Sequence, residues 1–119
     1  MSQQLFRISG IVEELETKRP LSGLIVRAFD KDVAFDDDLG MAVTDEVGLF
    51  RIEFSEAAFR DVWERRPDLY LRIYDPTGSW VVHESSDAVR WNATPDERFQ
   101  VAVPGSMLLP PSERANRRP

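Results

Sequence analysis

Two short apolar segments joined by a strongly acidic stretch constrain the fold of this chain most. Residues 24–29 are mostly apolar, and residues 49–54 alternate apolar with charged side chains. Both patterns are typical of β-strands, because successive side chains of a strand point to opposite faces. Between them, residues 30–48 contain seven acids and one base, which is too much charge to bury. The sequence therefore predicts two strands connected by a surface loop.

Five further segments carry strand signals, and turn sequences rich in Pro, Gly or Asp separate them. The clearest is residues 68–74, where Leu69, Leu71 and Ile73 alternate with more polar residues. Residues 44–48 resemble a β-hairpin turn, with Asp early and Gly where φ becomes positive. About seven short strands predict an all-β sandwich of seven to eight strands. The predicted strands are 6–12, 24–29, 41–44, 49–54, 68–74, 80–84 and 98–103.

One helix and a tail complete the predicted fold. Residues 55–66 place apolar side chains at helical spacing, Ser55 can cap the first turn, and Pro67 ends the pattern. Trp91 lies in a polar, turn-rich segment, where we expect it to anchor that segment on the core. Residues 105–119 are rich in Pro and Arg without periodicity, which predicts a flexible tail after a single domain at residues 1–104.

Composition excludes several classes of function. The chain has 119 residues, no cysteine and a net charge of −6, so disulfides and thiolate sites are excluded. The net negative charge argues against nucleic-acid binding, which needs a basic face. The sequence shows no apolar run of membrane-spanning length and no cleavable leader. We therefore expect a cytoplasmic protein by default, or one exported without a cleaved signal.

The acidic stretch is the strongest candidate for a metal site. Calcium prefers six to eight oxygen ligands, and clustered aspartates with loop carbonyls can supply them. The alternative is that these carboxylates are solvated or cap turns through local hydrogen bonds. If calcium binds, the expected ligands are Asp30, Asp32, Asp36 and Asp37.

The strand at 68–74 offers a candidate partner surface. Tyr70, Arg72 and Tyr74 form its outward row, and aromatic residues with Arg are enriched at protein interfaces. The alternative is that the predicted helix covers this face.

His83 is the only histidine of the chain and is followed by Glu84. A single imidazole without a second histidine or a cysteine does not complete a zinc site. No nucleophile motif such as Gly-x-Ser-x-Gly is present either. These observations predict that the chain is not an enzyme, with a small metal-dependent hydrolase as the alternative.

Several motifs, taken in order, resemble the transthyretin-like or carboxypeptidase regulatory-like β-sandwich superfamily. They are Gly10-x-Val12, Pro20-Leu21-x-Gly23-Leu24-x-Val26 and Thr44-Asp45-x-x-Gly48-x-Phe50. The string Asp30-x-Asp32-x-x-x-Asp36-Asp37-x-Leu39-Gly40 looks like a bacterial branch of that superfamily. The resemblance implies a binding module. Intradiol dioxygenases, on a related sandwich, hold iron with two Tyr and two His, and one histidine cannot supply both imidazoles.

Together, these observations predict a non-enzymatic binding or adaptor module that presents the acidic, calcium-binding loop to a protein partner. A structural subunit of a larger secretion or phage-tail-like assembly is the alternative, and homo-oligomers stay open. Calcium is the only cofactor expected.

Overall fold

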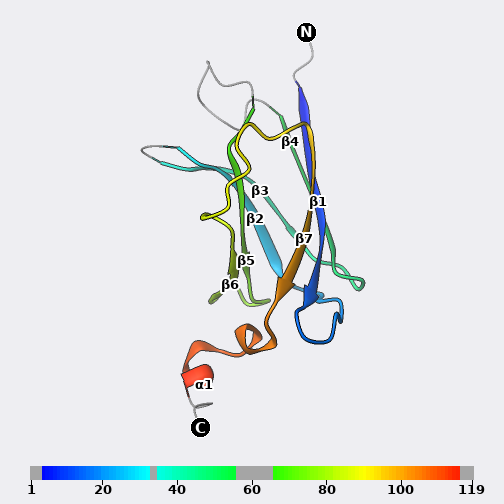
Figure 1. Cartoon of the computed structure of the whole chain (residues 1–119), viewed down its shortest axis with the longest axis vertical. Coiled ribbons are helices and arrows are strands. Elements are labelled where there is room, and N and C mark those ends of the chain that lie inside the picture. Colours follow the sequence, from blue (N-terminus) through cyan, green and yellow to red (C-terminus); the bar gives the residue numbers. More distant parts are fainter. Residues whose placement is uncertain (1–3, 33–34, 56–65, 116–119) are drawn as a thin grey trace.

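The computed structural model of the chain describes residues 4–32, 35–55 and 66–115. In this part of the chain, seven strands form two facing sheets, with strand orders β4–β1–β7 and β3–β2–β5–β6 (Figure 1). The predicted all-β, two-sheet architecture is confirmed, while the narrower transthyretin-like resemblance stays a prediction. The strands are β1 (Leu5–Glu14), β2 (Ile25–Asp30), β3 (Asp37–Val43), β4 (Leu49–Ser55), β5 (Leu69–Tyr74), β6 (Val81–Glu84) and β7 (Asp96–Val103).

The turn at residues 44–48 connects the two sheets rather than two paired strands. Gly48 N donates to Asp45 O at 2.9 Å, and Gly48 has a φ of +80°, as the turn prediction required. However, β3 pairs with β2, whereas β4 pairs with β1. The predicted hairpin is therefore wrong. A turn sequence fixes local geometry, but the strands that flank it pair according to where they bury their apolar faces.

The core lies between the sheets and is built from alternate residues of the strands. Val12, Val26, Leu71 and Ile73 are fully buried, and the rings of Phe6 and Phe54 stack at 5.2 Å. Each such side chain contributes about 1.5–3 kcal/mol on burial. The predicted inward faces of the strands at 24–29 and 68–74 are confirmed.

Gly10 allows the middle of β1 to approach its neighbours closely. A Cβ atom at this position would lie 2.5 Å from the Phe99 carbonyl oxygen and 2.8 Å from Cε1 of Phe50. Glycine inside a strand is typical of a bulge or a close backbone approach, and the structure shows the close approach.

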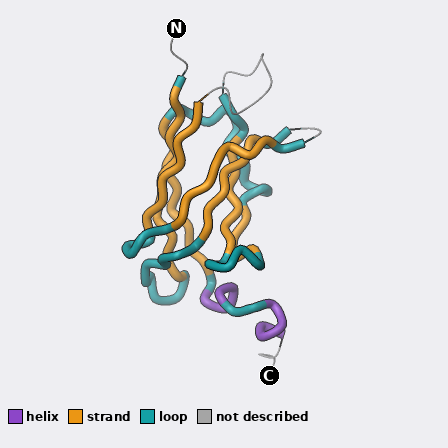
Figure 2. The backbone as a smooth tube through the Cα atoms, turned by 180° about the vertical axis from the view of Figure 1, so that it is seen from behind, coloured by secondary structure: helices purple, strands orange, loops and turns teal. Residues whose placement is uncertain are grey.

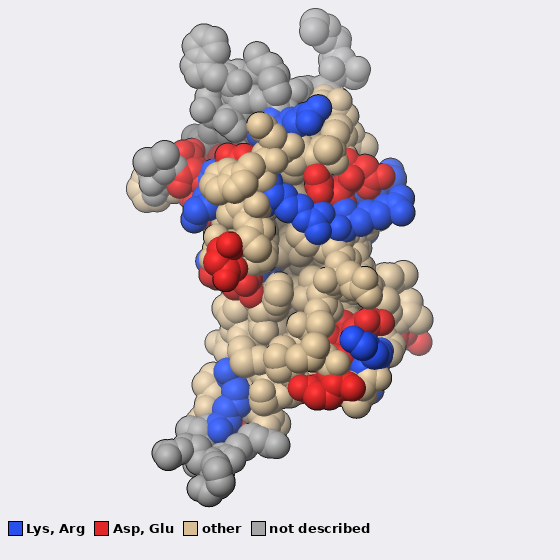
Figure 3. Space-filling model, viewed as in Figure 1, with Lys and Arg blue, Asp and Glu red and all other residues tan. Residues whose placement is uncertain are grey.

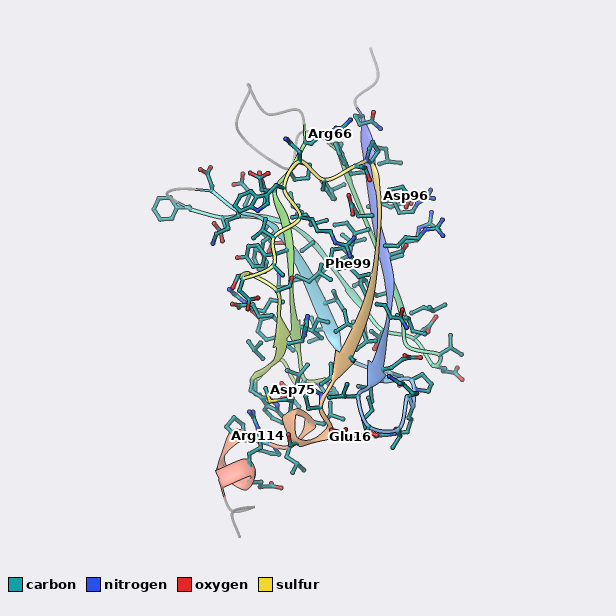
Figure 4. All side chains as sticks on the ribbon, viewed as in Figure 1. Glu16, Arg66, Asp75, Asp96, Phe99 and Arg114 are labelled. Carbon is teal, nitrogen blue, oxygen red and sulfur yellow. The ribbon has the colours of Figure 1, made fainter. Side chains whose placement is uncertain are left out.

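The C-terminal segment differs from the flexible tail that we expected. It contains a 3-10 turn, η2 (Gly105–Leu108), and a short helix, α1 (Pro111–Ala115) (Figure 2). Met107 and Leu108 pack against the core, because the segment contains apolar residues between its prolines. Trp80 Nε1 donates to Met107 O at 3.0 Å. Figure 4 shows Arg114 and Asp75 at the end of the molecule that carries the C-terminus.

Two other predictions have different outcomes. The helix predicted at 55–66 falls on residues 56–65, which lie outside the described residues. Trp91 does not anchor its loop, since 66% of its surface is exposed; Ala93 is the nearby buried residue. A segment with turns on both sides can expose an indole when a smaller neighbour fills the core.

Among the described residues, neither helix has the length or the apolar character needed to cross a membrane.

Candidate functional site

Hydrogen bonds within the protein hold the carboxylates of the acidic loop. Asp36 accepts a hydrogen bond from the Asp32 main-chain nitrogen at 2.9 Å through Oδ1. Its Oδ2 accepts from the Tyr70 hydroxyl at 2.6 Å. Asp30 is buried and accepts from the Asp68 nitrogen at 2.8 Å, and Asp37 lies opposite Asp30 in the β2–β3 register. These carboxylates thus fasten the loop to β5 and to the segment before it.

The loop buries Tyr70 and changes its acidity. Only 3% of Tyr70 is exposed, with Phe29 stacked on its ring at 5.3 Å and the Lys31 ammonium 5.8 Å from the ring centroid. Burial, followed by the hydrogen bond to Asp36, raises the pKa of Tyr70 to about 12. The same hydrogen bond lowers the pKa of Asp36. The pair is therefore a neutral phenol bound to a carboxylate across the physiological range.

The predicted calcium ligands are not brought together as a group. Among the described residues, no cluster of three or more His, Cys, Asp or Glu side chains could hold a metal ion. Asp30 and Asp36 instead accept hydrogen bonds from different parts of the chain. A metal site at Asp30, Asp32, Asp36 and Asp37 stays a prediction of the sequence alone.

The predicted partner row lies on the outer face of the β3–β2–β5–β6 sheet, but its first member is covered. Asp36 of the loop and Phe29 both contact Tyr70, and the helix predicted to cover this face lies outside the described residues. Arg72 is bound by Glu84, with Nε 2.5 Å from Oε1, and its guanidinium lies over the Phe29 ring at 5.1 Å. Tyr74 is half-buried. A partner surface at Tyr70, Arg72 and Tyr74 stays a prediction, and the buried Tyr70 ring is not available to it in this conformation.

His83 and Asp75 are the other notable titratable groups. His83 lies opposite Ile73 in the β5–β6 register, and burial lowers its pKa. Asp75 is buried in the turn between these strands, where it accepts hydrogen bonds from Thr77, Ser79 and Trp80. Burial alone would raise the pKa of Asp75, but these hydrogen bonds outweigh it and lower the pKa to about 2. Asp75 therefore acts as a structural acceptor.

A groove of about 660 Å³ with room for a ligand lies along the β4–β1–β7 sheet. The side chains that these three strands contribute from positions 9, 11, 49, 51 and 98 alternate with core residues, so they belong to the outer face of this sheet. The sequence analysis missed this groove, because the three strands are far apart in the chain and only their register aligns them. Residues of β3 and of the turn after it complete the groove. Its lining residues are Ser9, Gly10, Ile11, Ala42, Val43, Asp45, Leu49, Phe50, Arg51, Arg98 and Phe99.

One row across this face is basic. Ser9 pairs with Arg51 on one side and with Arg98 on the other. The neighbouring row consists of Glu53, Arg7 and Asp96. Arg51 binds Glu53 with Nη2 and Oε2 2.6 Å apart, whereas Arg98 lies 3.8 Å from Asp96 and is 81% exposed. Figure 3 shows basic side chains crossing the face that carries β7, with acidic side chains beside them.

The next row of the groove is apolar where it lies on β4 and β1. Ile11 lies directly opposite Leu49, and Val43 of β3 lines the same groove. Leu49 is 46% exposed and Val43 is 52% exposed, so part of this apolar surface meets solvent. Arg51 and Arg98 thus lie one step of about 7 Å along the strands from Leu49 and Ile11, and Ile11 pairs with Gln100 of β7 on its other side.

Comparison with solved structures places this fold among oxygenases. The 9R-lipoxygenase of Cyanothece PCC8801 matches at a TM-score of 0.59 and 28% identity, over 85% of this chain and 17% of the lipoxygenase. The dioxygenase domain of a carbohydrate-binding fusion protein from Streptomyces sp. SirexAA-E matches at 0.52 and 15%, over 87% of this chain and 81% of that one. An intradiol ring-cleavage dioxygenase of Tetranychus urticae matches at 0.52 and 14%, over 87% and 82%.

No family model matches the sequence, and neither does any curated protein sequence. At 14–15% identity, the two dioxygenases show a shared fold. This chain spans less than a fifth of the lipoxygenase, so it corresponds to a small part of that protein.

These neighbours correct the expected function. They are dioxygenases and a lipoxygenase, so the fold occurs in enzymes of oxygen chemistry. The predicted non-enzymatic adaptor is therefore wrong, whereas calcium binding stays a prediction. The prediction failed because it weighed the acidic loop and the lack of catalytic motifs, and neither indicates the function of proteins that share the fold.

The chain alone does not supply the iron ligands of an intradiol dioxygenase. It contains one histidine and two tyrosines, so the set of two Tyr and two His named above cannot be assembled. Tyr70 is engaged with Asp36, and the residues that the structure describes include no group of three or more His, Cys, Asp or Glu side chains that could hold a metal ion. These residues do not fit such a centre.

Proposed function

We propose that this chain is a substrate-binding β-sandwich domain of an oxygenase. The observation that carries the proposal is the likeness to the lipoxygenase, with 28% identity and a TM-score of 0.59 over 85% of this chain. The dioxygenase domains support it, because they match over a similar share of the chain. The fold match by itself would allow other roles, so the assignment also relies on the groove.

The domain contributes binding rather than the metal centre. Its residues do not fit an intradiol iron site, so the residues that activate oxygen lie outside this chain. The β4–β1–β7 groove offers about 660 Å³ for a substrate, and it places Arg51 and Arg98 beside apolar side chains. Few polar groups in an otherwise apolar concavity are typical of small-molecule sites.

A deletion experiment tests the proposal. Extract from cells that lack the gene for this chain is supplied with ¹⁸O₂ and a panel of catechols and unsaturated fatty acids. We expect ¹⁸O incorporation into at least one substrate to fall, and the purified parent chain to restore it. Equal incorporation by deleted and parent extracts would reject the oxygenase role.

A second comparison separates the oxygenase role from the groove. Arg51→Ala/Arg98→Ala and Arg27→Ala are added to the deleted extract in place of the parent. Arg27 is a half-buried arginine bound to Asp38 on the other sheet, so Arg27→Ala controls for the loss of one arginine charge away from the groove. If Arg27→Ala restores ¹⁸O incorporation and Arg51→Ala/Arg98→Ala does not, both the oxygenase role and the role of the groove are supported. If the parent and both variants restore incorporation, the oxygenase role is supported and the groove has no part in it.

A further inference from the structure

We infer that the open edge of β3 at Met41–Val43 binds an extended, basic segment of a protein partner, which adds a strand to the β3–β2–β5–β6 sheet. In the described part of the chain, β3 is an end strand of this sheet, so one of its sides has no neighbouring strand. A segment added there would be held by main-chain hydrogen bonds, and its side chains would supply the specificity. The inference goes beyond the proposed function, because it concerns a peptide on a sheet edge rather than a substrate in the groove.

The main-chain groups of Met41 and Val43 point away from β2. Thr44 N donates to Leu24 O at 2.9 Å, so residues 24 and 44 form a hydrogen-bonded pair. Bonded and non-bonded pairs alternate along an antiparallel ladder, so in this register Ala42 bonds to β2 and its two neighbours do not. Among the described residues, no main-chain carbonyl outside the sheet accepts from Met41 N or Val43 N. Both residues therefore present a donor and an acceptor to an added strand.

The other edge strands are short or carry charge, whereas this part of β3 is neither short nor charged. β6 has only four residues, and the outward positions of β4 and β7 include Arg51, Glu53 and Arg98. Short length and charged side chains disfavour the addition of a strand. The Met-Ala-Val stretch at residues 41–43 carries no charge, and Met41 and Val43 are 46% and 52% exposed. This stretch is therefore open to pairing.

The charges at both ends of the open stretch favour a basic occupant. Asp37 and Asp38 precede it, and Asp45 and Glu46 follow it. Arg27 balances one of these charges through a 2.9 Å ion pair with Asp38. A segment with Lys or Arg on both sides of an apolar centre would meet opposite charge at each end. Its apolar centre would cover the exposed side chains of β3.

Charge also disfavours a second copy of this chain as the occupant. The symmetric antiparallel register that joins the open groups pairs Met41 with Val43 of the second copy. The same register places Asp38 opposite Glu46 of the second copy, and this contact occurs twice in the dimer. Like charges directly opposite each other destabilise a strand pair, and each copy carries a net charge of −6. A segment of a different, basic protein is therefore the favoured occupant.

Fluorescence anisotropy of the purified chain with synthetic peptides tests the inference. The probe is the labelled nonapeptide Lys-Lys-Val-Thr-Val-Thr-Val-Lys-Lys, and the charge-reversed control has Glu in place of each Lys. We expect the basic peptide to bind, with an affinity that falls as salt rises, and the acidic peptide to bind at least about tenfold more weakly. No binding of the basic peptide at millimolar concentration, or equal binding of the acidic one, would overturn the inference.

Methylation of peptide nitrogens shows whether the peptide pairs as a strand. Only alternate N–H groups of an added strand face β3. Methylation of the valine nitrogens of the probe should therefore prevent binding, whereas methylation of the threonine nitrogens should leave the affinity within about twofold of the probe. Equal affinities of the two methylated peptides would contradict strand addition. This comparison uses the parent chain, so it does not depend on the folding of any variant.

Variants of β3 locate the peptide. Val43→Pro removes an outward N–H, and proline is tolerated at edge positions whose N–H faces solvent. Val43→Ala shortens the same side chain but keeps this donor. We expect Val43→Pro to bind the basic peptide about tenfold more weakly than Val43→Ala, and melting curves of both variants check the fold. Equal affinities of two folded variants would place the peptide elsewhere and overturn the inference.

Two further measurements separate this edge from the groove and from self-association. Ala42 and Val43 also line the groove, but Arg51→Ala/Arg98→Ala should bind the basic peptide at least as well as the parent, because it removes positive charge only. The proposed function and this inference can therefore fail separately. Sedimentation velocity should show a monomer without peptide. A dimer that Val43→Pro dissociates would show that a second copy occupies the edge, against the inference.

Discussion

The hydroxyl of Tyr70 donates a 2.6 Å hydrogen bond to Oδ2 of Asp36. This bond joins β5 to the acidic loop, which are 34 residues apart in the chain. The sequence analysis predicted Asp36 as a metal ligand and Tyr70 as part of a partner surface. In the structure, each is the hydrogen-bond partner of the other.

The bond between Tyr70 and Asp36 should stabilise the loop measurably. Tyr70→Phe keeps the ring against Phe29 but removes the donor, and we expect it to lower the free energy of unfolding by about 0.5–1.5 kcal/mol. Asp36→Ala removes the acceptor. Urea denaturation of both single variants and the double variant should give a coupling energy of about 1 kcal/mol, with Glu46→Gln as an exposed acidic control. Strictly additive effects would show that the two side chains do not interact.

Tyr70 should also give an alkaline pH dependence. Its folded pKa of about 12 lies above the unfolded value of about 10, so the fold favours the neutral phenol. This contribution is fully present below pH 10 and is lost as the pH rises toward 12. Melting temperatures of the parent should fall more steeply than those of Tyr70→Phe over this range. Parallel curves would contradict the raised pKa.

Asp75 should give an acid pH dependence. Its folded pKa of about 2 lies below the unfolded value of about 3.9, so the fold favours the carboxylate. The stabilisation is present above about pH 4 and is lost as the pH falls toward 2. Asp75→Asn does not titrate, so its melting temperature should start lower and fall less over this range. A variant with the same acid slope as the parent would assign that slope to other carboxyls.

Gly10 should tolerate no side chain. Gly10→Ala places Cβ against the Phe99 carbonyl and the Phe50 ring, and overpacking of this kind typically costs about 1–3 kcal/mol. Chemical denaturation should show this loss. Gln100→Ala, at an exposed position of β7, is the control and should unfold like the parent. Unchanged stability in Gly10→Ala would mean that β1 and β7 can separate at little cost.

The C-terminal segment should protect Trp80. Deletion of residues 105–119 removes the Met107 carbonyl that accepts from the indole N–H. We expect the Trp80 Nε1 proton to exchange faster with solvent and the melting temperature to fall, both measured by comparison with the full chain. The exposed Trp91 serves as an internal reference, and its exchange should not change. Equal exchange of the Trp80 proton in both proteins would show that the segment does not dock.

The residues of the groove are far apart in the sequence, which is why the sequence analysis did not find it. Arg51, Ser9 and Arg98 come from three strands, and no local pattern relates them. Each is an ordinary outward position in its own strand. Only the parallel pairing of β1 with β7 and the antiparallel pairing of β1 with β4 places them in one row.

The sequence by itself located seven strands, because alternation of apolar and polar residues is local and each strand turns one face to the core. It began the third strand at residue 41, whereas β3 begins at Asp37, because the acidic residues there resemble a loop. It also determined the close approach at Gly10 and the turn at residues 44–48. Which strands pair, what covers Tyr70 and where a ligand can lie were decided only by the tertiary structure. These features depend on register and on contacts between distant segments, whose free energy comes from burying the two sheets against each other.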